Sequence, residues 1–154
     1  MIQKFMSKFK KSAKKTTVPY NSRLIQKFEK DHKKIVQLAG KIAQAIEEKN
    51  RKEITESLKN FKVALLGHFM EEDTALYQYL KEYYKDNPSV YELILEFYSS
   101  IKEIQQKLLD FLNKYTREDI RYDSMFEREF QEIVKTLATR VESEETSLYT
   151  LYVK

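Results

Sequence analysis

The stretch His68–Tyr77, "HFMEEDTALY", places a histidine and a glutamate four residues apart within an apolar helical pattern. The stripe around it repeats at steps of three and four residues, and its members are Ile54, Leu58, Phe61, Leu65, His68, Glu72, Leu76 and Tyr79. Residues at these steps lie on one face of an α-helix. The sequence therefore predicts a long helix over about 52–85 whose buried face carries two polar side chains.

Comparable stripes predict three further helices, over about 22–48, 88–115 and 125–152. The stripe of the first helix has His32 as its polar member, the third is apolar throughout, and the fourth carries Arg140 and Glu144. Four long amphipathic helices with short connections favour an antiparallel, up-down-up-down bundle. The predicted fold class is all-α.

The composition agrees with this fold and excludes several kinds of chemistry. The chain has 154 residues with only two glycines and two prolines, which fits one helical domain. It has no cysteine, so disulfides, thiolate catalysis and iron–sulfur clusters are excluded. No apolar run approaches the roughly 20 residues that span a bilayer. These features predict a cytoplasmic protein.

The charge is unevenly distributed along the chain. The formal net charge is +4, but residues 1–15 hold six lysines and no acid, which leaves −2 for the remainder. We therefore expect residues 1–20 to form a flexible basic leader and residues 21–154 to form the bundle. The mildly acidic bundle argues against nucleic-acid binding. The leader, with its interspersed apolar residues, is compatible with contact to an anionic membrane surface or an acidic protein partner.

The second and fourth helices contain an internal repeat. The stretch "HFMEEDTALYQYL" aligns without gaps with "RVESEETSLYTLY", which begins at Arg140. The alignment, extended to the preceding helices, gives these pairs: His68 with Arg140, Glu72 with Glu144, Leu76-Tyr77 with Leu148-Tyr149, and His32 with Phe97. A duplicated helix pair predicts that the core polar residues lie near one level of the bundle.

Buried polar side chains need partners, because an unpaired buried carboxylate costs several kcal/mol. The set consists of His32, His68, Glu72, Arg140 and Glu144. Two imidazoles and two carboxylates suit iron, manganese or zinc. Alternatively, the permanent cation Arg140 takes the place of an ion and bonds both glutamates. The nearby tyrosines are expected at the edge of the core with hydroxyls in water, and they are Tyr77, Tyr79, Tyr83, Tyr149 and Tyr152.

The stretch "FEKDHKKI" followed by "HFMEEDTALY" resembles the hemerythrin-like family of HHE cation-binding domains. The resemblance implies a four-helix bundle with a non-haem iron centre and places His32, His68 and Glu72 at ligand positions, with Glu144 as the acidic ligand of the last helix. The third helix has no histidine, only Phe97 with Glu96 beside it, and Arg140 stands where the last helix of the family has histidine. These departures indicate a depleted site, mononuclear or empty.

The resemblance leads to two expectations about function. The first is a metal-binding domain that senses or stores iron or responds to dioxygen and is not an enzyme. Its metal ligands are His32, His68, Glu72 and Glu144, with Arg140 and Glu96 beside them. The second is a metal-free interaction protein, because the Arg-x-x-x-Glu motif of the last helix also resembles the bacterial regulator-of-sigma-D family of anti-sigma factors.

Overall fold

A computed structural model describes residues 16–154, and all regular elements in that range are helical. The helices are α2 (Leu24–Glu47), α3 (Arg51–Glu71), α4 (Gln78–Tyr83), α5 (Pro88–Tyr115) and α6 (Ser124–Ser143). Two π-helical turns, η1 (Glu72–Tyr77) and η2 (Glu144–Leu148), and a final 3₁₀ turn, η3 (Tyr149–Leu151), complete the elements. Because α3, η1 and α4 follow without a break, and α6, η2 and η3 likewise, the chain forms four rods.

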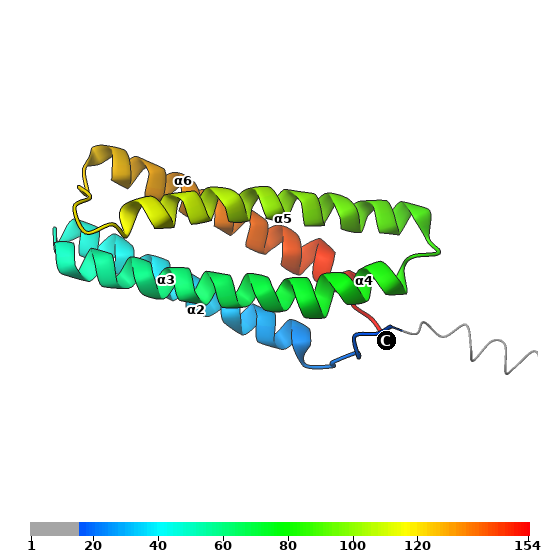
Figure 1. Cartoon of the computed structure of the whole chain (residues 1–154). Helices are drawn as coiled ribbons and strands as arrows, with labels where there is room; N and C mark the ends of the chain where they lie inside the picture. Colours follow the sequence, from blue (N-terminus) through cyan, green and yellow to red (C-terminus); the bar gives the residue numbers. More distant parts are fainter. Residues whose placement is uncertain (1–15) are drawn as a thin grey trace, which may run out of the picture.

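The four rods form an up-down-up-down bundle (Figure 1). Helices α2 and α5 begin at the end where the C-terminus lies, and α3 and α6 begin at the opposite end. Each rod packs against its neighbours in the chain, and α6 also contacts α2, which closes the bundle. The prediction of an all-α, up-down-up-down four-helix bundle is confirmed.

Local signals in the sequence set the starts of three rods. The side chains of Asn50, Asn87 and Asp123 accept hydrogen bonds from backbone N–H groups in the first turns of α3, α5 and α6, at 3.1, 3.4 and 3.1 Å. Pro88 occupies the first turn of α5, where a missing N–H costs nothing. These caps set the residues at which the three helices begin.

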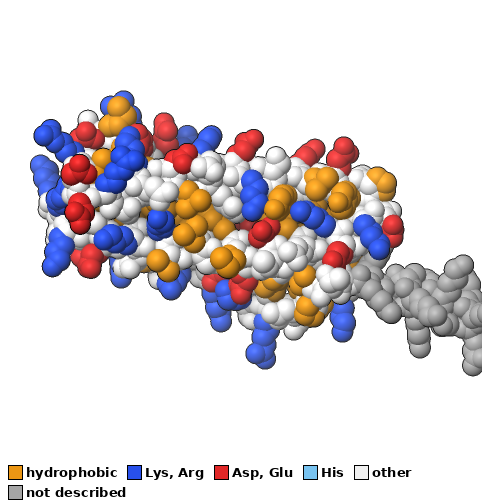
Figure 2. Space-filling model, in the orientation of Figure 1, with side chains coloured by type: hydrophobic (Ala, Val, Ile, Leu, Met, Phe, Trp, Pro, Cys, Tyr) orange, Lys and Arg blue, Asp and Glu red, His pale blue; other side chains and the backbone are white. Residues whose placement is uncertain are grey.

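The core contains the predicted stripes. Aromatic and aliphatic side chains from all four rods fill it, and the largest fully buried ones include Phe28, Phe61, Phe126 and Tyr77. Among the described residues, no helix is both long and apolar enough to cross a membrane. On the face in Figure 2, basic and acidic side chains are interspersed.

Most of the predicted leader, residues 1–15, lies outside the described residues. Its last part contacts the bundle: the Thr17 backbone N–H donates to Glu82 Oε2 at 2.6 Å, and the Tyr20 ring stacks on Tyr152 with centroids 4.8 Å apart. A domain boundary at residue 20 stays a prediction.

Candidate metal centre

Four polar side chains from three rods meet inside the bundle. His32 comes from α2, His68 from the last turn of α3, Glu72 from the start of η1 and Glu144 from the start of η2. One nitrogen or oxygen from each residue lies within 4.8 Å of those of the others. Their exposed fractions are 3, 4, 1 and 2%. The structure thus brings together the four residues that the sequence predicts as ligands.

The two imidazoles direct the same ring nitrogen toward the carboxylates. His32 Nε2 lies 3.1 Å from Glu144 Oε1, and His68 Nε2 lies 3.2 Å from Glu72 Oε2. The two imidazole rings contact each other with centroids 4.8 Å apart. Two nitrogens and two carboxylate oxygens therefore face a common centre.

The outer ring nitrogens contact two further carboxylates. His32 Nδ1 lies 2.7 Å from Glu145 Oε2, and His68 Nδ1 lies 2.9 Å from Asp31 Oδ2. A carboxylate that accepts from Nδ1–H orients the ring and leaves the Nε2 lone pair free for a metal. Sequence reasoning did not assign this role to Asp31 or Glu145. Their only signal is position, since Asp31 precedes His32 and Glu145 follows Glu144.

Two inward atoms lack a hydrogen bond. They are His68 Nε2 and Glu72 Oε1, both fully buried. His68 Nε2 lies close to Glu72 Oε2 but without the angles of a hydrogen bond. Buried polar atoms almost always find a partner, so each exception needs an explanation. A transition-metal ion would be a partner for both atoms, and the nitrogen and oxygen donors fit such an ion.

Arg140 lies at the edge of this cluster and is 6% exposed. Its Nε donates to Glu144 Oε2 at 3.2 Å, and its Nη2 donates to Tyr77 Oη at 2.7 Å and to the carbonyl oxygen of Phe97 at 3.1 Å. The guanidinium also lies over the Phe97 ring, 5.2 Å from its centroid. The prediction that Arg140 bonds both glutamates is wrong for Glu72, because the guanidinium points toward α5.

Two predictions about positions around the ligands are corrected. Glu96 is exposed on α5, one residue before Phe97, so it does not lie beside the cluster. One residue step rotates a side chain by about 100° around a helix, which turns Glu96 away from the core. Tyr77 and Tyr149 are 1% and 4% exposed, so their hydroxyls are not in water as expected.

Tyr77 and Tyr149 reach the core because the second and fourth rods each contain a π turn. Each turn begins at the core glutamate, at Glu72 in η1 and at Glu144 in η2. A π turn widens the helix and brings residues five apart onto one face. Tyr77 follows Glu72 by five residues, and Tyr149 follows Glu144 by five. Such turns are frequent at functional sites.

The cluster shifts the pKa values of its members. Burial opposes protonation of His68, but Glu72 and Asp31 outweigh it and raise the pKa to about 9. Burial raises the pKa of Glu72 above its ordinary value, against the effect of His68. For Glu144 burial acts in the same direction, but His32, Glu72 and Arg140 together lower the pKa. In the metal-free core, Glu144 is thus the carboxylate that stays ionised.

A bundle whose facing helices supply imidazoles and carboxylates at one level has the arrangement of helix-bundle metalloproteins. The family model of the Hemerythrin HHE cation binding domain matches residues 23–152. The chain therefore belongs to the hemerythrin family of HHE cation-binding domains. Searches of curated proteins and of solved structures found no match to it.

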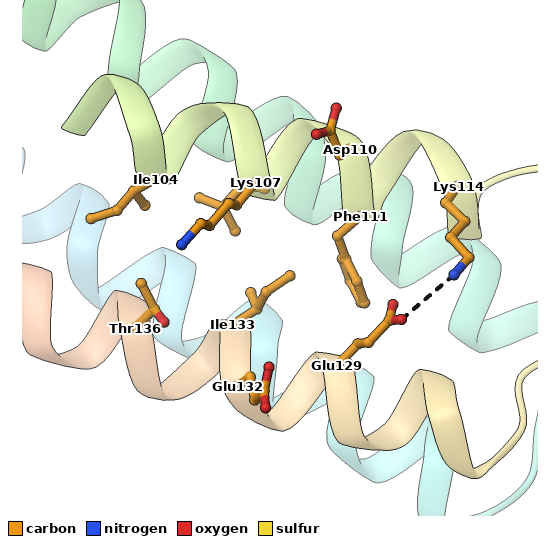
Figure 3. Close-up of a pocket in the computed structure, with 10 residues that line it drawn as sticks. Ile104, Lys107, Asp110, Phe111, Lys114, Glu129, Glu132, Ile133 and Thr136 are labelled. Carbon is orange, nitrogen blue, oxygen red and sulfur yellow. Dashed lines mark hydrogen bonds and ion pairs between the residues drawn. The ribbon is translucent and has the colours of Figure 1, made fainter. Parts of the chain in front are cut away.

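The surface hollow between α5 and α6 is separate from this cluster (Figure 3). It has a volume of about 410 Å³ and is lined by ten residues, among them Ile104, Phe111 and Ile133. The ion pair from Lys114 Nζ to Glu129 Oε1, at 3.5 Å, crosses one end of it. None of the four candidate ligands lines the hollow.

Proposed function

We propose that the chain binds a single transition-metal ion, iron in the first place, through His32, His68, Glu72 and Glu144. The observation that carries the proposal is the orientation of the two imidazoles. Both Nε2 atoms face the carboxylates, and both Nδ1 atoms lie against outer carboxylates. The atoms His68 Nε2 and Glu72 Oε1, which have no hydrogen bond, support the same centre.

One ion is proposed rather than two because the other half of the core is already filled. Arg140 brings a permanent cation next to Glu144, and Phe97 brings an aromatic ring. Neither side chain can coordinate a metal. Four ligand residues are too few to hold two ions with open positions.

The proposed role is sensing or storage of iron, or a response to dioxygen, rather than catalysis. Bound iron supplies a redox change and an affinity for dioxygen that the side chains lack. The ligands are at most 4% exposed, so only an ion or a very small molecule fits among them. Zinc and manganese suit the same donors. The cytoplasm is the proposed location, in keeping with a chain that has no cysteine.

Metal analysis of protein purified without a chelator tests this function. We expect about one ion per chain, and we expect His68→Ala to remove it, because the variant loses one of only two nitrogen ligands. Met70→Ala is the control, since Met70 lies two residues away and is 69% exposed. A low metal content that His68→Ala leaves unchanged would reject the proposed centre.

The alternative is a metal-free interaction protein, and one surface feature favours it. A hollow of about 460 Å³ between α2 and α6 is lined mainly by apolar side chains, including Val36, which is 62% exposed. This alternative expects His68→Leu to leave a protein partner bound and deletion of residues 1–15 to weaken that binding. The metal centre is preferred because an interaction surface gives no reason for two imidazoles and two carboxylates to converge in the core.

A further inference from the structure

Tyr149 has an unusual position among the candidate ligands. Its Oη lies 2.8 Å from Glu72 Oε2, 3.2 Å from His32 Nε2 and 3.3 Å from Glu144 Oε1. The ring stacks against His32 with an interplanar angle of 15°. A hydroxyl has one proton, so it can donate to only one of three neighbours. Two of the neighbours are carboxylate oxygens, so when both carboxylates are ionised at least one of these contacts brings two oxygen lone pairs together in a buried site, which favours a cation among them.

The same distances match the spacing of donor atoms around an ion. With metal–ligand bonds of about 2.1 Å, two donors at right angles lie about 3.0 Å apart. Tyr149 Oη meets three of the proposed donors at 2.8 to 3.3 Å. The distances from His32 Nε2 to Glu144 Oε1 and from His68 Nε2 to Glu72 Oε2, at 3.1 and 3.2 Å, lie in the same range.

We propose that Tyr149 Oη is a further ligand of the metal centre and that it makes ferric iron the preferred ion. The inference rests on the proposed function, because it needs an ion held by the four other residues. On binding, the oxygen–hydrogen bond of the phenol breaks, the proton leaves to water, and the oxygen lone pair bonds to the ion. No electron is transferred, since the iron enters as ferric. The phenolate adds a hard anionic oxygen, which suits a small trivalent ion.

Tyr77 provides a matched control for Tyr149. It occupies the corresponding place in η1, five residues after Glu72, and it is also buried. Its hydroxyl accepts a hydrogen bond from Arg140 Nη2 at 2.7 Å, on the side of the core that holds no candidate ligand nitrogen. Replacing either tyrosine by phenylalanine thus removes one buried hydroxyl at the same helix position, but only one of the two changes touches the ligands.

The test loads the full chain with ferric iron and records the iron content, the visible spectrum and the resonance Raman spectrum. A phenolate bonded to ferric iron absorbs in the visible by charge transfer, whereas carboxylate and imidazole ligands do not. We expect a coloured protein whose Raman spectrum, excited in this band, shows tyrosine ring modes. Tyr149→Phe is expected to bind iron but lose the band entirely, and Tyr77→Phe to keep it.

The possible results separate this inference from the proposed function. Iron bound at one ion per chain without a visible band overturns the role of Tyr149 and leaves the four-residue centre in place. A visible band that persists in Tyr149→Phe also overturns the role of Tyr149 and leaves the four-residue centre in place. A wild-type chain that binds no iron overturns both. The Raman spectrum of the wild-type protein decides the point even where a variant folds poorly.

Discussion

The helix pair α2 and α3 and the helix pair α5 and α6 carry different chemistry on the same framework. In each pair the second helix, α3 or α6, continues into a π turn. The π turn begins at a core glutamate, and a buried tyrosine follows that glutamate by five residues. The first pair adds His32 and His68, where the second has Phe97 and Arg140. The backbone feature is thus shared, and the difference lies in the side chains: the first pair supplies both nitrogen ligands of the candidate site, and the second supplies Glu144 together with the cation Arg140.

The two pairs also differ in how their polar groups are supported. In the first pair the carboxylate of Asp31 lies against His68, whereas its counterpart in the repeat, Glu96, is exposed. Arg140 instead uses the Tyr77 hydroxyl and the carbonyl oxygen of Phe97. A metal-binding imidazole usually donates its other ring N–H to a carboxylate, a carbonyl oxygen or water, which orients the ring. A guanidinium is charged at all ordinary pH values and needs only acceptors.

The largest effect is expected from Arg140→Leu, which removes the cation of the second pair. Glu144 stays buried without the guanidinium and keeps only His32 as a basic neighbour, and the Tyr77 hydroxyl loses its donor. Breaking one side of a buried ion pair costs about 3–5 kcal/mol, and we expect this loss in the free energy of unfolding of the metal-free protein. Urea denaturation measures it.

Arg128→Leu is the control for this variant, because Arg128 lies on the same helix and is exposed. A substitution at an exposed position usually changes the free energy of unfolding by no more than about 0.5 kcal/mol. The metal content of Arg140→Leu should remain near one ion per chain, since Arg140 is not a ligand. Equal stability of the two variants would mean that the second pair does not depend on its buried cation.

The helices and the core polar residues could be predicted from the sequence, but part of the site could not. Steps of three and four residues identify the buried face of an α-helix, so His32 and Glu144 were found. Tyr149 follows Glu144 by five residues, a step that faces the core only in a π turn. Asp31 and Glu145 were missed because they contact histidines of other rods. Such contacts depend on how the rods pack.

A second prediction concerns pH and separates the two pairs by titration. His68 has an ordinary pKa of 6.5 and a pKa of about 9 in the folded chain, because Glu72 and then Asp31 outweigh the opposing effect of burial. Because the pKa is raised on folding, the contribution of His68 to the free energy of unfolding is complete below pH about 6.5 and is lost as the pH rises through about 9. The shift corresponds to roughly 3 kcal/mol. The raised pKa of Glu72 likewise makes the folded state less stable as the pH rises.

Urea denaturation of chelator-treated protein at pH about 6 and about 9.5 measures this loss. His68→Gln should flatten the profile, whereas the Arg140 side keeps its charge throughout. Metal affinity should change in the opposite direction and rise with pH, since protons compete for the same nitrogens. A metal-free stability that is flat or rises between these pH values would contradict the pairing of His68 with the two carboxylates.

The smallest effect is expected where the outer carboxylates orient the histidines. Asp31→Asn keeps an oxygen that can accept from His68 Nδ1 but removes its charge, so the imidazole becomes a weaker ligand. Loss of such a partner lowers metal affinity about 10–100-fold, or roughly 1.4–2.8 kcal/mol. Competition with a chelator of known affinity measures it. Glu142→Gln, at an exposed position on α6, should change nothing.

Glu145→Gln provides the comparison within the site, because Glu145 supports His32 as Asp31 supports His68. The Glu145 side chain is 35% exposed and that of Asp31 is 24% exposed. Water can replace part of the lost interaction at the more exposed position, so the affinity should fall less for Glu145→Gln than for Asp31→Asn. If neither variant changes the affinity while His68→Ala removes the metal, the imidazoles are oriented by packing alone, and the carboxylates have no part in binding.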